Sequence, residues 1–251
     1  MGWKIFIAND FNKRLIVFIS ILLVVNMVTV FFYDLMISKI FRLASTISVL
    51  VYLFAYKFNH RLIYAVLLII IVSDIAIVGY EYNWGVFLYG ITATLSYLLL
   101  ALNVVRNIEW TQINWYEYLI YAFVLVFNFY TFNFLSNNIS SDFDSDIIFY
   151  SLKVSGIMGI IMCLISGLHN ATRLSFKTAY FMYATFGLVF SDFSAMLAYY
   201  YKMEPFLFYF LDRAMYIFAF YCLIKYVYYY TEEQKLIEVK AKRSFQDSKV
   251  L

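Results

Sequence analysis

The fold of this chain is decided by two long apolar runs that each contain one aspartate. The first, LIYAVLLIIIVSDIAIVGY, covers residues 62–80, and the second, TAYFMYATFGLVFSDFSAMLAYY, covers residues 178–200. Each run has the length of a membrane-spanning helix, since a hydrocarbon core of about 30 Å requires roughly 20 apolar residues. A carboxylate inside such a helix costs about 3 kcal/mol or more, so it marks a candidate functional site. Asp74 and Asp192 are therefore the first candidate functional residues.

The composition of the whole chain excludes an ordinary soluble domain. Of its 251 residues, 64% are hydrophobic and 14% are charged, whereas a soluble domain carries about 25% charged residues. We predict an all-α polytopic membrane protein, with a bundle of eight transmembrane helices over residues 1–230 and a charged cytoplasmic tail over residues 231–251. The loops are too short to hold a separate soluble catalytic domain. The eight predicted helices cover residues 15–36, 41–57, 62–80, 86–105, 116–136, 147–169, 178–200 and 206–230.

The distribution of Lys and Arg predicts that both termini are cytoplasmic. With the N-terminus inside, the outer loops hold only Lys39, Arg42 and Lys202, and all other basic residues outside the predicted helices fall on the inner side;. Both termini reach the same side only with an even number of helices, which agrees with eight. The composition fits a bacterial inner membrane protein, and the net charge of +3 does not indicate a nucleic-acid-binding surface.

The sequence contains no motif for a metal or for a phosphate-binding loop. Cys163 and Cys222 both fall inside apolar segments, so they indicate neither a disulfide framework nor a zinc site;. We therefore expect no metal site.

A weak internal repeat suggests two four-helix halves in the same orientation. Parallel repeats of this kind occur among membrane transporters. The positions that repeat at a nearly constant offset are Ser73-Asp74 with Ser191-Asp192, and Tyr97 with Tyr216.

Three further charged residues are expected at the depth of the two aspartates. Lys153 lies in the sixth predicted helix, and Asp212 and Arg213 lie in the eighth. Embedded charges usually face the bundle interior and pair with one another, so the five residues are expected to form one polar cluster. Asp212-Arg213 would also fit a purely structural ion pair, and Lys153 would also fit a side chain that extends to the interface. The candidate substrate-binding residues are Ser73, Ser191, Tyr97, Tyr216, Lys153, Asp212 and Arg213.

Two carboxylates in one desolvated site are suited to acid–base chemistry. One acts as the general acid while protonated, and the other, ionised, activates water, as in the cleavage of glycosidic acetals. The same pair would also suit proton transport. The residue types alone leave both alternatives open.

One stretch of the chain resembles a known family. YATFGLVFSDFSA, residues 183–195, is similar to the seventh-helix signature of the lysoplasmalogenase family, the YhhN-like eight-helix membrane proteins. Asp74, followed by Phe87 and Gly90, fits the second acidic motif of that family. The resemblance implies hydrolysis of the vinyl-ether bond of a lysoplasmalogen, a membrane lipid, to a fatty aldehyde and a glycerophospho-headgroup. It also implies that Asp74 and Asp192 are catalytic and that no cofactor is required.

The chain departs from the family pattern at three places. Ser73 replaces the glycine that commonly precedes the third-helix aspartate, Ala195 replaces a leucine, and residues 94–102 lack the usual histidine. Two alternatives to an enzyme remain open: a proton-coupled transporter, and a non-catalytic membrane sensor or assembly factor.

Overall fold

The chain folds into a bundle of long helices. A computed structural model describes residues 2–79, 81–139, 146–198 and 205–247, and these form eight α-helices, one short 3-10 helix and no strand. This architecture confirms the predicted all-α polytopic membrane protein. The elements are α1 (Gly2–Phe32), α2 (Leu35–Ala55), α3 (Arg61–Val78), α4 (Asn83–Val105), the 3-10 helix η1 (Trp110–Gln112), α5 (Trp115–Ile139), α6 (Asp146–Arg173), α7 (Phe176–Met196) and α8 (Pro205–Asp247).

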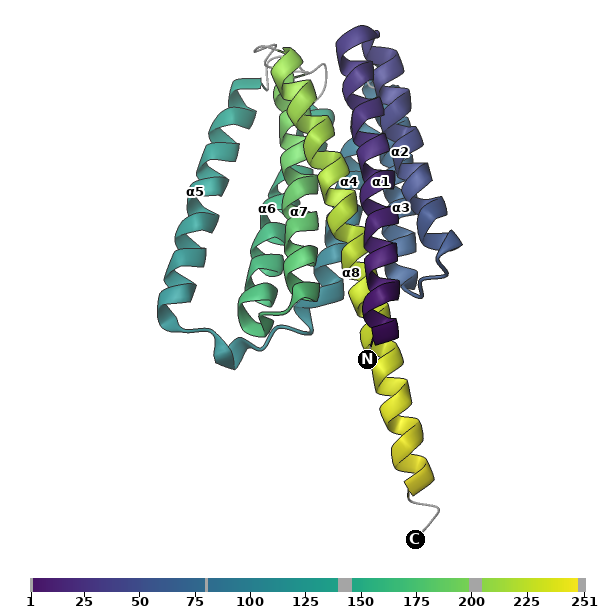
Figure 1. Ribbon diagram of the computed structural model, residues 1–251. Helices are drawn as coiled ribbons and strands as arrows, with labels where there is room; N and C mark the ends of the chain where they lie inside the picture. The colour runs from purple at the N-terminus through teal and green to yellow at the C-terminus, as the bar shows by residue number, and fades with distance from the viewer. Residues whose placement is uncertain (1, 80, 140–145, 199–204, 248–251) are drawn as a thin grey trace.

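Seven of the helices formed by the described residues are long and apolar enough to cross a membrane. The remaining helix, α7, has 21 residues but carries Lys177, Asp192 and several hydroxyl side chains. It packs between α6 and α8 along the length of the bundle (Figure 1). Its polar residues are therefore sheltered by neighbouring helices.

Three predicted boundaries differ from the observed ones by more than five residues. Helix α2 begins at Leu35 instead of residue 41, so Lys39 and Arg42 lie inside the helix and are buried. The outer loop to which they were assigned is therefore much shorter than predicted. Helix α1 begins at Gly2 instead of residue 15, and α8 continues to Asp247 instead of ending at residue 230. The described part of the predicted tail is thus a helical extension of α8 that projects beyond the bundle (Figure 1).

Small residues allow the closest helix pairs to approach. A Cβ atom at Gly90 of α4 would lie 2.8 Å from the backbone carbonyl carbon of Ser151 in α6. A Cβ atom at Gly187 of α7 would lie 2.9 Å from Ala219 Cβ in α8. Close approach at small residues is the usual basis of helix packing in membranes. The pairs α7 with α8 and α4 with α6 also share the most extensive contacts between the described helices.

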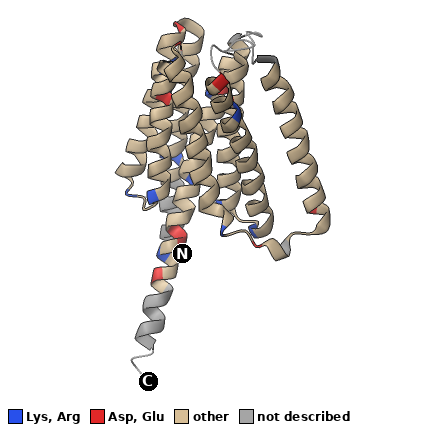
Figure 2. Ribbon diagram, turned by 180° about the vertical axis from the view of Figure 1, so that it is seen from behind, with Lys and Arg blue, Asp and Glu red and all other residues tan. Residues whose placement is uncertain are grey.

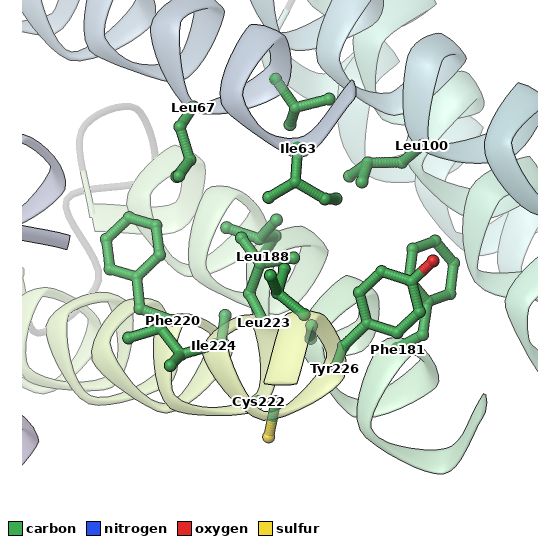
Figure 3. Close-up of a cluster of buried hydrophobic side chains, with 14 of the residues drawn as sticks. Ile63, Leu67, Leu100, Phe181, Leu188, Phe220, Cys222, Leu223, Ile224 and Tyr226 are labelled. Atoms are coloured by element: carbon green, nitrogen blue, oxygen red, sulfur yellow. The ribbon is translucent and has the colours of Figure 1, made fainter. Parts of the chain in front are cut away.

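The apolar core lies where α3, α4, α7 and α8 meet. Leucine, isoleucine and phenylalanine side chains from these four helices converge there (Figure 3). Ile63, Leu100 and Phe220 are each at most 1% exposed. These four helices carry most of the functional residues described below, and the core fixes their relative positions.

Charged residues are distributed unevenly along the bundle. Lys and Arg residues gather toward the end from which α8 projects (Figure 2). Helix α1 begins and α8 ends at that same end (Figure 1). The cytoplasmic location of this end stays a prediction based on the distribution of basic residues.

Helix α5 stands apart from the rest of the bundle (Figure 1). Its main neighbour is α6. Most of its large side chains are exposed, including Phe123, Val126 and Tyr130 at 66–71%. In a bilayer these side chains face lipid, so α5 is held by fewer protein contacts than the other helices.

Candidate functional site

Arg42 of α2 forms the centre of a buried ionic cluster. Its guanidinium donates from Nε to Asp74 Oδ1 at 3.0 Å, from Nη1 to Asp212 Oδ1 at 2.7 Å and from Nη2 to Asp192 Oδ1 at 3.3 Å. The Arg42 side chain is 3% exposed. A planar guanidinium with five donors can bridge several carboxylates in this way, which a lysine ammonium cannot do with the same geometry. We call Arg42, Asp74, Asp192, Asp212 and Arg213 the Arg42 cluster.

Asp74 of α3 is fully enclosed, and both of its carboxylate oxygens accept hydrogen bonds. Its Oδ2 accepts hydrogen bonds from Thr46 Oγ1 at 2.5 Å and from the Tyr216 hydroxyl at 2.7 Å. The Arg42 guanidinium also lies 4.0 Å from the centre of the Tyr216 ring. The Asp74 side chain is only 1% exposed, so it is enclosed by its partners Arg42, Thr46 and Tyr216.

Asp212 of α8 is the second enclosed acid. It accepts from Arg42, from Ser191 Oγ at 2.5 Å and from Arg213 Nη1 at 2.7 Å. Arg213 also donates to Ser38 Oγ in α2 at 3.2 and 3.3 Å. The Asp212-Arg213 pair therefore links α8 to α2 and α7 inside the bundle.

Asp192 of α7 is the only acid of the Arg42 cluster with substantial exposure. Its side chain is 24% exposed, whereas the side chains of Asp74 and Asp212 are 1% exposed. The hydroxyl of Tyr97 in α4 donates to Asp192 Oδ2, and Tyr89 of the same helix also hydrogen-bonds to this carboxylate. Asp192 is thus held on one side by Arg42 and on the other by two tyrosines.

The exposed side of Asp192 faces an apolar cavity of about 340 Å³. The cavity lies between α5, α6 and α7, with contributions from α3 and α4. Its walls are mainly aromatic and aliphatic, and Asp192 is the only charged residue among the described residues that line it. The lining includes Tyr89, Tyr97, Tyr121, Leu125, Phe132, Leu152, Cys163, Leu164, Asp192, Phe193 and Met196.

Phe132 forms the contact that closes part of this cavity. A Cβ atom at Gly156 of α6 would lie 2.1 Å from the Phe132 ring. Because Gly156 has no side chain, the Phe132 ring of α5 can occupy this space. The contact holds the weakly packed helix α5 against α6.

The structure brings together most of the predicted site residues. Asp74, Asp192, Asp212 and Arg213 share the Arg42 cluster, and Ser191 donates to one of its acids. Tyr97 and Tyr216 each donate to an aspartate of the other half of the chain. Ser73 is buried beside Asp74 on α3.

Lys153 is the exception, because it lies outside the cluster in which it was predicted. Its ammonium donates to Asn137 Oδ1 at 3.0 Å and lies 5.4 Å from the centre of the Phe149 ring. Its position along α6 gives the predicted depth, but the side chain points away from the four clustered residues. The second base of the cluster is Arg42 instead.

Arg42, Thr46 and Tyr89 are the functional candidates that sequence reasoning missed. A signal for two of them is present, because Ser38, Arg42, Ser45 and Thr46 follow one another at spacings of four, three and one residues. Such spacing places polar side chains on one face of a helix. All four are buried on the inner face of α2.

The arrangement is suited to holding one proton next to an apolar ligand. The cluster contains three carboxylates and two guanidiniums, so one added proton makes it electrically neutral. An uncompensated charge inside a bundle is costly, and Asp192 is the acid that meets the cavity. Among the described residues, no group of three His, Cys, Asp or Glu side chains has an arrangement that could hold a metal ion.

Comparison with known proteins finds no similar protein. No protein-family model matches the chain, and neither the curated proteins nor the solved structures include a match.

Proposed function

We propose that this chain is an intramembrane hydrolase that cleaves the vinyl-ether bond of a lysoplasmalogen-type lipid. The observation that carries the proposal is the position of Asp192, a carboxylate held by Arg42, Tyr97 and Tyr89 in the wall of an apolar cavity. A single hydrocarbon chain is the ligand that such walls accept, since ligand sites combine apolar surfaces with a few placed polar groups. The sequence resemblance to the lysoplasmalogenase family supports the same activity.

The reaction requires one acid and one water. The protonated Asp192 transfers its proton to the vinyl carbon remote from the ether oxygen, which leaves an oxocarbenium ion at the carbon bonded to that oxygen. Water adds to this ion and loses a proton to the ionised Asp192, giving a hemiacetal. The hemiacetal then breaks its bond to the glycerol oxygen, and the products are a fatty aldehyde and a free glycerol hydroxyl. General acid catalysis of this kind contributes about 10²- to 10⁴-fold.

Asp74 acts through Arg42 in this proposal. It does not line the cavity, but its bond to Arg42 Nε fixes the guanidinium that in turn contacts Asp192. Tyr97 and Tyr89 orient the Asp192 carboxylate from the opposite side. After proton transfer, the negative charge on Asp192 lies opposite the positive oxocarbenium ion, and Asp192 keeps its contact with Arg42.

Release of aldehyde by the purified protein tests the proposal. We expect wild-type protein to release aldehyde from lysoplasmenylethanolamine, and Asp192→Asn to lower the rate at least about 100-fold because amide nitrogen cannot supply the proton. Asp146→Asn is the matched control, since Asp146 lies exposed in the first turn of α6. Equal rates for wild type and Asp192→Asn would refute the proposed role of Asp192.

Proton-coupled transport is the second candidate, and the Arg42 cluster favours it. Three acids around one arginine can take up and release a proton while the helices keep their positions. Vesicles containing the protein would then show substrate-dependent proton uptake that Asp192→Asn abolishes. Aldehyde release without any proton flux would exclude this alternative.

A further inference from the structure

The cavity beside Asp192 extends mainly toward one end of the bundle. Helix α5 runs away from the end where α8 projects, and its lining residues extend from Tyr121 to Phe132. At 1.5 Å per residue these eleven steps cover about 17 Å. Helix α6 runs the opposite way, and its lining residues from Leu152 to Leu164 cover a similar length. The cavity is therefore an elongated space roughly parallel to the helices.

Its length corresponds to one leaflet of a bilayer. Half of a hydrocarbon core of about 30 Å is about 15 Å, close to the length of the lined space. One hydrocarbon chain in the orientation of its neighbours in the membrane would fill it.

The charged group of the described lining lies near one end of this space, whereas uncharged polar side chains such as Asn128 and Thr131 lie along it. Asp192 is sixteen residues from the start of α7 and only four residues from its end at Met196. Tyr89 lies six residues from the start of α4, which begins at the same end of the bundle. Beyond Asp192 toward the end where α8 projects, the described wall residues include uncharged polar side chains but no other charged one. The polar part of a ligand therefore belongs at the end of the bundle opposite the termini.

We propose that the cavity binds a single-chain lipid from the leaflet opposite the two termini, with the headgroup beyond Asp192 and the chain extending toward Tyr121 and Leu164. Lipid enters laterally past α5, which has α6 as its main neighbour and exposes most of its apolar side chains. This inference deepens the proposed hydrolase by stating which leaflet supplies the substrate, and it rests on that proposal only for the identity of the bond cleaved.

Photocrosslinking in nanodiscs tests the position of the lipid. The probes are two non-cleavable alkyl-ether lysophosphatidylethanolamines, one with a diazirine next to the glycerol and one with a diazirine at the end of the chain. We expect the first probe to label Phe193, Met196 and Leu152, and the second to label Tyr121 and Leu164. The reverse pattern would place the headgroup at the termini and overturn the inference.

Two adjacent residues of α5 provide a matched control for annular lipid. Leu125 lines the cavity, whereas Val126 is 66% exposed and is not among the lining residues. We expect Leu125→Trp to reduce labelling of the cavity residues at least about fivefold and Val126→Trp to leave it unchanged, with both variants eluting as wild type in size-exclusion chromatography. Labelling that both variants leave intact would mean that the probes report only lipid around the protein, and would overturn the inference.

The same probes separate the two proposals. Because the alkyl-ether lipids are not hydrolysed, the predicted labelling measures binding alone. Correct labelling together with no aldehyde release from lysoplasmenylethanolamine would refute the hydrolase and leave the lipid site standing. Aldehyde release together with the reverse labelling pattern would support the hydrolase and refute the proposed orientation of the lipid.

Discussion

At the scale of single residues, Arg42 determines whether the site can exist. It is the one side chain that contacts all three acids of the cluster, and both Asp74 and Asp212 are enclosed around it. A buried ionic network adds little stability over a well-packed apolar core, but removal of one partner leaves charges that have no compensation. Arg42 is therefore more important for keeping the acids together than for the net stability of the fold.

Arg42→Gln is expected to destabilise the protein by about 3–5 kcal/mol, because it leaves the acids unpaired inside the bundle. Chemical unfolding in detergent micelles measures this change. Arg173→Gln is the control, since the Arg173–Glu109 pair is 40% exposed on both sides and exposed pairs contribute about 0–1 kcal/mol. Equal unfolding midpoints for the two variants would contradict the central position of Arg42.

His60 gives the fold a dependence on pH at the end where the termini lie. It precedes α3 and contacts the Tyr226 hydroxyl at 3.3 Å through Nε2. Burial, with a smaller contribution from the charge of Lys177, lowers the pKa of His60 from 6.5 to about 4. The unfolded chain therefore binds a proton at His60 over a pH range in which the folded protein does not.

The lower pKa of His60 in the folded protein determines how the stability changes with pH. A pKa that is lower in the folded state gives stability that is complete above pH 6.5 and is lost as the pH falls toward 4. Each pKa unit corresponds to about 1.4 kcal/mol, so we expect a loss of about 2–3 kcal/mol between these pH values. His60→Phe should remove this part of the pH dependence of the unfolding free energy. An unchanged pH profile in that variant would contradict the assignment to His60.

At the scale of helices, the contact between α4 and α6 positions Tyr97 and Tyr89 against Asp192. The contact depends on Gly90, where an added Cβ would meet the Ser151 backbone at 2.8–2.9 Å. Backbone atoms cannot move aside as a side chain can, so α4 and α6 would have to separate. Such a separation would move both tyrosines relative to α7.

Gly90→Ala is accordingly expected to destabilise the bundle by about 1–3 kcal/mol, the usual cost of overpacking. Gly159→Ala should cost less, since its nearest neighbours are the Val189 methyl groups at 3.2 and 3.3 Å. Thermal unfolding of the two variants in the same detergent gives the comparison. The account of helix packing fails if Gly159→Ala is the more destabilised of the two.

Hydrophobic runs were sufficient to predict the number and type of the helices, because the bilayer thickness sets their length. Position along a helix also gave the depth of Asp74, Asp192, Asp212 and Arg213, which the structure brings together. Depth does not specify the side of a helix on which a residue lies. Lys153 therefore had the predicted depth but contacts Asn137 instead of the acids.

Arg42 was missed for a different physical reason. A hydropathy pattern treats Lys39 and Arg42 as a break in the apolar run, so they were assigned to a loop. Their burial depends on partners far away in the sequence, such as Asp212 for Arg42. The cavity was also outside the reach of sequence reasoning, because it results from the loose packing of α5 and leaves no periodic pattern.

At the scale of the whole molecule, two pairs of residues join the predicted halves of the chain. Tyr216 of α8 donates to Asp74 of α3, and Tyr97 of α4 donates to Asp192 of α7. The two bonds are equivalent under the predicted 4+4 repeat, which stays a prediction. Their surroundings differ, since Asp74 is enclosed and Asp192 meets the cavity. This difference in exposure is the basis on which we propose that Asp192 is the reactive aspartate and Asp74 the structural one.

The proposed hydrolysis through protonation of the vinyl ether is tested most directly by the fate of the proton that is transferred to the lipid. Wild-type protein is incubated with lysoplasmenylethanolamine in D₂O, and the aldehyde is trapped by reduction as it forms and analysed by mass spectrometry. The account predicts one deuterium on the carbon next to the former carbonyl carbon, because the general acid protonates that position. Absence of aldehyde, or aldehyde without deuterium at that carbon, would contradict hydrolysis through protonation of the vinyl ether.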